Sequence, residues 1–243
     1  MPRSALVLLL VIPLAQCTTP RPVAEPNGEV VVLLHGLART SGSMKKMEKA
    51  LRADGYQTIN HDYPSTKNEL PELATNSLAP VLERDDVAQA KAIHFVTHSM
   101  GGILVRQYLA THPKPPNLGR VVMLAPPNNG SEIVDKLGAQ GWFKAIFGPG
   151  GCSLNTDHSN PPKQLGPVDY PVGVIAGDRV LNVITTFMVP GPDDGTVSVE
   201  SSKLDGMHDH RVVHADHTFI MMKRQTIDLT RNFLKTGSFE GMD

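Results

Sequence analysis

Ser99 is the residue whose neighbours point most directly to chemistry. It stands in the run Thr-His-Ser-Met-Gly-Gly at 97–102, directly after an apolar stretch and before an amphipathic one. A strand, a sharp turn and a helix in this order hold a serine hydroxyl at the tip of the turn, where it can act as a nucleophile. The residues two positions away must be small: Gly101 is, and we take Thr97 as a tolerated variant of the usual glycine. The alternative is a serine that caps an ordinary helix.

A serine nucleophile needs a base within hydrogen-bonding reach and a carboxylate that holds the base in the right tautomer. His217 lies just after a predicted strand, at the start of the last predicted helix, and is our preferred base. Among the ten histidines, His214 is its only serious rival. The expected chain order is serine, acid, histidine.

Three aspartates are candidates for the acid. Asp194, in the run Pro-Asp-Asp-Gly-Thr-Val, precedes His217 by 23 positions, which leaves room for one helix and one strand. Asp178 directly follows a predicted strand in Gly-Asp-Arg. We rank Asp194 first, Asp178 second and Asp193 third. The candidates that are not the acid would be ordinary turn residues, because turns favour aspartate next to glycine.

The charge that develops on a substrate oxygen during acyl transfer needs backbone N–H donors. In a strand–turn–helix arrangement one donor belongs to the residue after the nucleophile, here Met100, and the other to the loop after an early strand. His-Gly-Leu at 35–37 follows the first strong strand. Gly36 allows the chain to turn there, so we predict that Leu37 supplies the second N–H.

A zinc site is a competing interpretation, because histidines and aspartates crowd the segment before the last helix. They are His208, Asp209, His210, His214, Asp216 and His217. If this segment bound zinc, the serine, acid and oxyanion motifs would all have arisen by coincidence. We therefore predict no metal and no cofactor. Cys17 and Cys152 are the only cysteines, which excludes a disulfide-stapled scaffold and a Cys₄ metal site.

These residues lie at the ends of strands in a repeated β-α-β pattern. Apolar runs predict strands at 30–34, 57–60, 92–97, 121–124, 172–176 and 211–213. Amphipathic runs predict helices at 44–53, 70–82, 102–111, 197–204 and 218–234. The first strand is apolar on both faces, as in sheets covered by helices on both sides. We therefore expect an α/β fold with a mostly parallel central sheet flanked by helices.

The segment 126–168 breaks this pattern, because it is rich in Pro, Gly and Asn, and we interpret it as a cap-like insertion over the sheet. Its short apolar piece contains Trp142, Phe143, Ile146 and Phe147. These side chains could line an acyl pocket or touch membrane lipid. Core packing over the sheet is the alternative.

Composition limits the classes of partner. The 243 residues are 40% hydrophobic and 19% charged, which is ordinary for one folded domain. Lys and Arg total 23 against 24 acidic residues, for a net charge of −1, and they are spread along the chain. We therefore expect no nucleic-acid partner. The sequence does not reveal the oligomeric state.

The N-terminus has the features of an export signal. Arg3 precedes an apolar run at 5–15 that is too short to span a bilayer. The junction before Cys17 resembles a bacterial lipoprotein signal, although Gln16 replaces the usual small residue. The resemblance implies a signal at 1–17, lipidation of Cys17, a tether at 18–28, a domain at 29–243, and a periplasmic, membrane-anchored protein of the bacterial envelope. Cleavage without a lipid and an uncleaved anchor are the alternatives.

Taken together, the motifs resemble bacterial lipases and esterases of the α/β-hydrolase superfamily. They are His35-Gly36-Leu37, the run at 62–66 (Asp-Tyr-Pro-Ser-Thr), the run at 97–102, the run at 125–131 (Ala-Pro-Pro-Asn-Asn-Gly-Ser), and the run at 193–197 with His217. The resemblance covers nearly the whole mature chain. It implies a hydrolase of small-molecule or lipid carboxylic esters, with Ser99 as nucleophile, Asp194 as acid, His217 as base, and Leu37 and Met100 as oxyanion donors.

Two alternatives stay open at this level. The same residues would serve an acyltransferase, which differs only in admitting a hydroxyl acceptor other than water. A non-catalytic envelope protein could keep the fold and use the cleft to bind. The complete serine, histidine and acid set argues against the second alternative.

Overall fold

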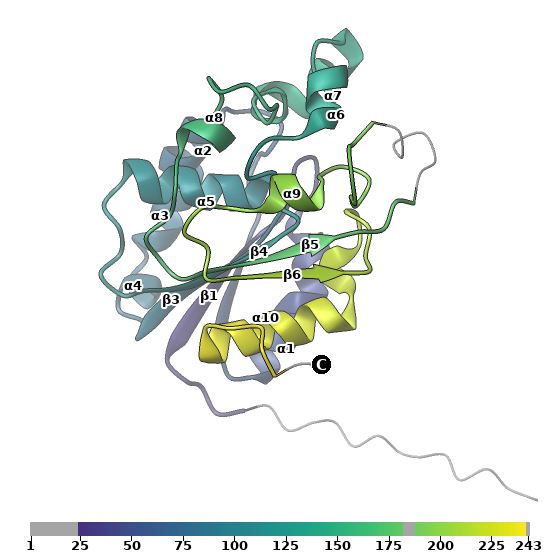
Figure 1. Cartoon of the computed structure of the whole chain (residues 1–243). Helices are drawn as coiled ribbons and strands as arrows, with labels where there is room; N and C mark the ends of the chain where they lie inside the picture. Colours follow the sequence, from purple (N-terminus) through teal and green to yellow (C-terminus); the bar gives the residue numbers. More distant parts are fainter. Residues whose placement is uncertain (1–23, 182–187, 242–243) are drawn as a thin grey trace, which may run out of the picture.

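The computed structural model describes residues 24–181 and 188–241. The predicted export signal, Cys17 and most of the predicted tether lie outside these residues. Six strands form one sheet in the order β2-β1-β3-β4-β5-β6, and every neighbouring pair is parallel. Helices cover both faces (Figure 1). The predicted α/β class with a parallel central sheet is therefore confirmed.

All six predicted strands are confirmed, each with slightly wider bounds. They are β1 Glu29–Leu34, β2 Gln57–His61, β3 Ala92–His98, β4 Leu118–Leu124, β5 Val172–Gly177 and β6 Asp209–Val213. Because the strands are parallel, their carboxyl ends meet at one edge of the sheet. The loops that carry the candidate chemical residues leave from that edge.

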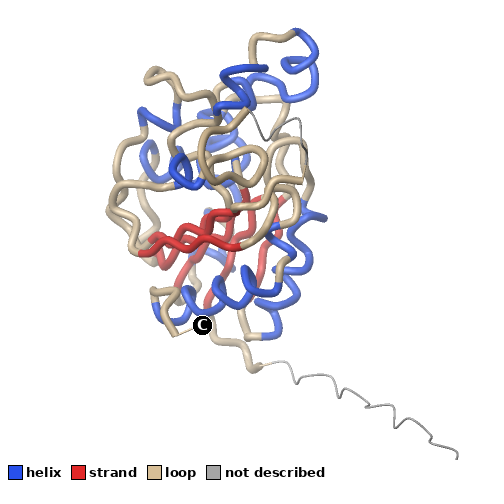
Figure 2. Tube along the Cα trace, turned by 45° about the vertical axis from the view of Figure 1, so that its right-hand side comes forward, coloured by secondary structure: helices blue, strands red, loops and turns tan. Residues whose placement is uncertain are grey.

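The two helical layers use opposite faces of the same strands. Helices α1 (Lys45–Ala53) and α10 (Arg224–Thr236) cover one face, and α5 (Met100–Thr111) lies on the other. In β1, Val31 and Leu33 pack in the core beneath α1 and α10, whereas Val32 packs in the core with α5. This alternation explains why β1 is apolar throughout. Figure 2 shows the strands between the two helical layers.

The predicted helix at 70–82 is present but uneven. It consists of α2 (Leu70–Leu73), a π-helical turn (Ala74–Leu78) and α3 (Ala79–Leu82) in direct succession. Pro80 lies at the start of α3 and has no N–H to donate to the preceding turn. A wider turn before the proline accommodates this loss. The short helix α4 (Asp85–Ala88) was not predicted.

The prediction of a continuous last helix from 218 was wrong. A 3-10 turn occupies Ile220–Met222, and α10 starts at Arg224 after an extended Lys223. Asp216 explains the difference, because its side chain accepts from the N–H of Phe219 at 3.1 Å and its carbonyl accepts from Ile220 at 3.1 Å. These bonds form a separate turn after His217.

The predicted helix at 197–204 was too long. The observed helix, α9, covers Val199–Ser202. Ser198 caps it, since its side chain accepts from the N–H of Ser201 at 3.0 Å.

The region of the predicted insertion contains three helices rather than one short apolar piece: α6 (Glu132–Leu137), α7 (Gly141–Cys152) and α8 (Pro161–Gln164). Helices α6 and α7 project above the rest of the domain (Figure 1). Gly148 kinks α7 with a φ of 64°, and a Cβ there would lie 1.7 Å from the carbonyl oxygen of Thr66. Glycine is required at this point because α7 packs directly on the backbone after β2.

Within residues 24–181 and 188–241, no helix is both long and apolar enough to cross a bilayer.

Two buried histidines make the stability of the fold depend on pH. His94 and His98 are each 2% exposed, and burial is the main cause that lowers the pKa of both below 6.5. Below pH 6.5 the unfolded chain binds protons at these positions that the folded chain does not bind. The free energy of unfolding should therefore be constant above about pH 7 and fall as the pH drops below 6.5, by up to about 1.4 kcal/mol per pH unit for each histidine.

Urea unfolding at pH 8, 7, 6 and 5 measures this change through the transition midpoint. A midpoint that stays constant or rises between pH 7 and pH 5 would contradict the prediction. This range lies above the pH at which ordinary carboxylates titrate, so the histidines dominate the change.

Candidate active site

Ser99 occupies a strained turn between β3 and α5. Its backbone has a φ of 52° and a ψ of −124°, a combination that costs a residue with a side chain about 1–3 kcal/mol. Its N–H donates to the carbonyl of Leu124 at 2.8 Å, and its own carbonyl accepts from Gly102 at 2.9 Å. The turn is therefore held from the neighbouring strand and from the helix that follows.

Gly101 and Gly102, which follow Ser99, are required for two different steric reasons. A Cβ at Gly101 would lie 2.8 Å from the carbonyl oxygen of His35, so α5 packs against the backbone after β1. A Cβ at Gly102 would lie 3.3 Å from Oγ1 of Thr97. The second glycine thus leaves room for the threonine that replaces the usual glycine before the nucleophile.

The structure brings Ser99, His217 and Asp194 together. Nε2 of His217 lies 3.0 Å from Oγ of Ser99, and Nδ1 lies 2.7 Å from Oδ2 of Asp194. An ionised carboxylate only accepts hydrogen bonds, so Nδ1 carries the proton and Nε2 is left to accept the serine proton.

Several contacts fix the carboxylate of Asp194. It is 2% exposed, and its Oδ1 accepts from the N–H groups of Thr196 at 3.0 Å and Val197 at 2.8 Å. The backbone carbonyl of Asp194 also accepts from the N–H of His217 at 2.9 Å. The acid and the histidine are thus joined through both main chain and side chain.

The rival residues lie elsewhere. Asp178 and His214 pair with each other, with Oδ1 3.0 Å from Nδ1, on the protein surface. Asp193 is buried, its Oδ1 accepts from Gly195 at 2.7 Å, and burial raises its pKa. None of the three contacts Ser99 or His217.

The segment 36–39 and the start of α5 border the space in front of Ser99. Met100 is the first residue of α5, so no earlier carbonyl of the helix can accept from its N–H. No acceptor for the N–H of Leu37 exists among the described residues. Ala38 has a φ of 53°, and its N–H donates to Oγ of Ser65 at 3.1 Å. The turn therefore leaves the N–H groups of Leu37 and Met100 available to a ligand.

The run at 62–66 supports this segment. The ring of Tyr63 stacks on His35 at 4.3 Å between centroids, and its hydroxyl donates to the carbonyl of His35 at 2.7 Å. Together with Ser65, this contact clamps the loop after β1 to the loop after β2.

His98 is a site residue that the sequence did not single out. It is buried, and its Nε2 donates to the backbone carbonyl of His217 at 2.9 Å. A Cβ at Gly36 would lie 2.7 Å from Nδ1 of His98, so the glycine also provides room for this ring. The residue before Ser99 thus holds the backbone of His217.

A cavity of about 560 Å³ opens onto Ser99 and His217. Most of its lining residues are apolar, and the inserted helices supply several of them, including Val134, Leu137 and Phe147. In the apolar cluster, Phe143 is buried in the core and also lines the cavity, whereas Ile146 is exposed and does not line it. Core packing and pocket lining are therefore combined in Phe143. Arg39 lines the cavity too and was not singled out.

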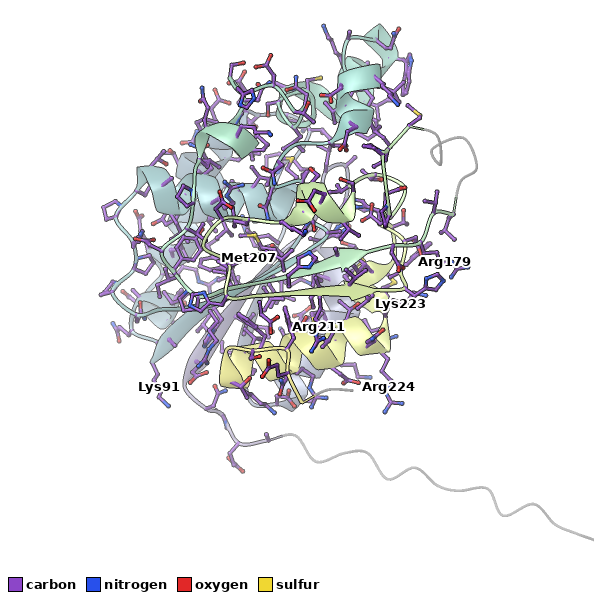
Figure 3. All side chains as sticks on the ribbon, viewed as in Figure 1. Lys91, Arg179, Met207, Arg211, Lys223 and Arg224 are labelled. Carbon is purple, nitrogen blue, oxygen red and sulfur yellow. The ribbon has the colours of Figure 1, made fainter. Side chains whose placement is uncertain are left out.

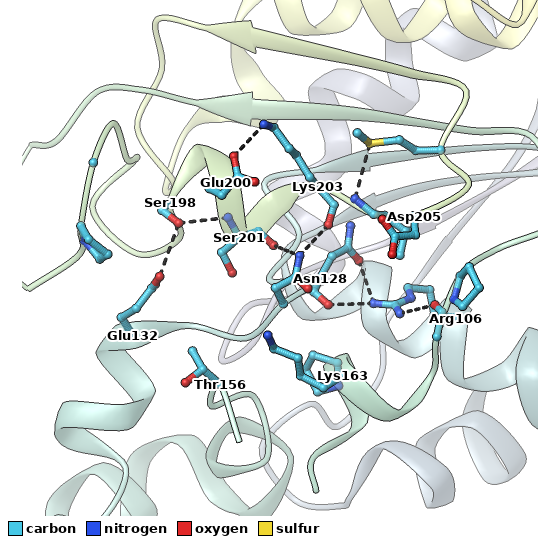
Figure 4. A pocket seen from close by; sticks show the side chains of 18 residues that line it. Arg106, Asn128, Glu132, Thr156, Lys163, Ser198, Glu200, Ser201, Lys203 and Asp205 are labelled. Carbon is cyan, nitrogen blue, oxygen red and sulfur yellow. Dashed lines mark hydrogen bonds and ion pairs between the residues drawn. The ribbon is translucent and has the colours of Figure 1, made fainter. Parts of the chain in front are cut away.

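A larger cavity, of about 860 Å³, is bordered by the segments 128–132 and 198–207 (Figure 4). The two cavities have no lining residue in common. The larger one borders Arg106, whose Nη atoms donate to Asn128 at 3.1 Å and to the carbonyl of Gly166 at 2.9 Å. Burial lowers the pKa of Arg106 to about 10, so it stays charged at neutral pH. It connects α5 to two loops and lies away from the triad.

The histidines considered for zinc bind to separate partners. His208 accepts from the N–H of Val172, His210 lies 3.2 Å from Oγ of Ser202, and His214 pairs with Asp178. Among the residues that the structure describes, no three of the types that bind metals form a group suited to a metal ion.

Comparison with known proteins agrees with this geometry. Residues 31–217 match a family model described as "Alpha/beta hydrolase family". No curated protein matches the chain.

Similar solved structures carry the names of lipases. Bacillus licheniformis lipase BlEst2 in its mature form is 21% identical, with 89% of this chain and 94% of that chain covered and a TM-score of 0.62. Phospholipase PlaB from Legionella pneumophila is 17% identical, with 86% and 60% covered and a TM-score of 0.70. Staphylococcus hyicus lipase is 14% identical, with 89% and 96% covered and a TM-score of 0.57. At these sequence identities, the structural similarity supports the fold alone. The match over 31–217 shows that the chain belongs to the alpha/beta hydrolase family.

Proposed function

We propose that the protein is a serine hydrolase that cleaves carboxylic esters through an acyl-enzyme on Ser99. The observation that carries the proposal is the hydrogen-bonded row of Asp194, His217 and Ser99, which opens into a largely apolar cavity. The bond lengths of 2.7 and 3.0 Å allow proton transfer without rearrangement.

In the first half of the reaction, Nε2 of His217 takes the proton from Oγ of Ser99 as the oxygen attacks the ester carbonyl. The carbonyl oxygen becomes negative and accepts from the N–H groups of Leu37 and Met100. Asp194 stabilises the imidazolium that forms. The C–O bond to the alcohol then breaks, and His217 gives the proton to the departing alcohol. The acyl group stays on Ser99.

In the second half, water repeats the sequence. His217 removes a proton from water, the resulting oxygen attacks the acyl carbonyl, and the proton returns to Oγ of Ser99 as the acid is released. No cofactor enters either half. Analysis of products in the presence of added alcohols distinguishes hydrolysis from acyl transfer.

The substrate class rests on two supports. The apolar wall of the cavity favours an acyl chain, because removing such a chain from water is favourable at about 25 cal/mol per Å². The similar structures are named as lipases and a phospholipase, which act on esters of this general kind.

The main prediction concerns the triad. Replacement of Ser99 by Ala should lower kcat/KM on 4-nitrophenyl butanoate and octanoate by about 10³- to 10⁶-fold and abolish labelling by a fluorophosphonate probe. Asp194→Asn should lower kcat by about 10³- to 10⁴-fold, because the wrong histidine tautomer is then favoured.

Asp178→Asn and His214→Asn are the matched controls, because they alter an equivalent pair on the surface. Both should keep wild-type activity within about twofold. Equal rates for wild type and Ser99→Ala, or a larger loss for Asp178→Asn than for Asp194→Asn, would contradict the proposal.

A second prediction concerns His98 as a positioning residue. Leucine at this position removes the bond to the carbonyl of His217, so kcat should fall by about 10- to 100-fold through misplacement of the base, with less change in KM. Glutamine keeps an N–H donor, and His98→Gln should recover much of the lost kcat. Melting temperatures are measured alongside. Equal losses of kcat for the two variants at matched stability would refute a positioning role.

A further inference from the structure

Arg39 is the charged side chain of the catalytic cavity. It follows the turn at Ala38 in the loop after β1, and it borders the same cavity as Ser99 and His217. Its backbone N–H donates to the carbonyl of Gly36 at 3.2 Å, which fixes its position in the loop. The side chain therefore starts from a rigid point close to the reacting atoms.

The guanidinium of Arg39 has no partner of its own. Among the described residues it makes no ion pair and no side-chain hydrogen bond. The undescribed segments 1–23 and 182–187 contain no aspartate or glutamate, and the undescribed residues 242–243 include one, Asp243. By contrast, Arg52, Arg84 and Arg231 each pair with a carboxylate.

Among the described residues that line the catalytic cavity, the side chains with a fixed charge are positive. Arg39 is its only lysine or arginine, and none of its described lining residues is aspartate or glutamate. The larger cavity differs, because Lys203 pairs with Glu200 there and its other basic lining residues, Arg106 and Lys163, are balanced by Glu132 and Asp205 (Figure 4). Of these two cavities, the catalytic one thus presents an uncompensated positive charge to a ligand beside an apolar wall.

The charge of Arg39 acts on His98, the residue before Ser99. Burial is the main cause of the lowered pKa of His98, the charge of His217 is the next, and the charge of Arg39 lowers this pKa further. Together with its place in the wall of the cavity, this contribution puts Arg39 near the turn that carries Ser99.

We propose that Arg39 is a specificity residue that binds an anionic group on the alcohol part of the ester, so that the preferred substrates join an apolar acyl chain to an acidic alcohol. This inference rests on the proposed ester hydrolysis. A guanidinium suits carboxylate and phosphate alike, because its N–H groups form a planar fork.

The charge is assigned to the alcohol part for a physical reason. The apolar wall from α6 and α7 favours the acyl chain, and a charge on that chain would have to leave water for this wall. We place the alcohol part beside Arg39, His217 and Thr218, which are polar residues of the same cavity.

The test compares octanoyl esters of three phenols that differ in the para substituent: carboxylate, neutral carboxamide and trimethylammonium. Relative to the ratios in Arg39→Gln, the wild type should favour the carboxylate ester over the carboxamide ester by about 10-fold or more in kcat/KM and should favour the trimethylammonium ester least. Intrinsic differences between leaving groups cancel in that comparison. Arg39→Lys should retain part of the preference, because it keeps the charge and loses the fork.

Arg224→Gln is the control, because Arg224 is an exposed arginine at the start of α10 that does not line the catalytic cavity (Figure 3). It should keep the wild-type ratio. Raising NaCl from 0.02 to about 0.5 M should reduce the preference in the wild type, and this readout needs no variant.

The outcomes separate the two proposals. Hydrolysis of all three esters with the same ratios of kcat/KM in wild type and Arg39→Gln, or a ratio that shifts toward the trimethylammonium ester when Arg39 is present, overturns the role of Arg39 and leaves ester hydrolysis intact. No hydrolysis of any ester, together with no labelling by the fluorophosphonate probe, overturns ester hydrolysis itself. If Arg39→Gln does not fold, Arg39→Lys and the salt dependence decide.

Discussion

The hydrogen bond between Asp194 and His217 joins two loops, although these residues lie 23 positions apart in the sequence. The rest of the site is arranged around this bond. One carboxylate oxygen accepts from the histidine ring, and the other accepts from two backbone N–H groups. Because three hydrogen bonds hold its two oxygens in a buried place, the carboxylate has one stable orientation. The ring of His217 takes its tautomer and its direction from that orientation, and Ser99 meets it from the turn after β3.

The strained backbone of Ser99 is maintained by packing rather than by local preference. Backbone bonds to Leu124 and from Gly102 hold the turn on both sides, and Gly101 allows α5 to touch the main chain after β1. His98 adds a contact from the same turn to the backbone of His217. Ser99 and His217 are therefore coupled through the main chain as well as through their own hydrogen bond.

The sequence predicted the sheet well because parallel strands with two covered faces leave long apolar runs, as in β1. It also singled out Ser99, His217 and Asp194, whose positions depend on strand ends and chain order. The start of the last helix could not be predicted, since Asp216 forms a local turn that competes with the helical pattern. His98 and Arg39 could not be singled out either. Their roles depend on contacts across the carboxyl edge of the sheet, which no local pattern encodes.

The chain enters the domain at the edge opposite the catalytic cavity. Ala24 and Asn27 donate to the carbonyls of Ala53 and Gly55, which fixes the entering segment beside the start of β1. The carboxyl ends of the parallel strands, where Ser99 lies, are at the far side. Residue 24, where the described chain begins, consequently lies away from the mouth of the cavity. Were the domain fixed to a surface at this residue, its cavity would face away from that surface.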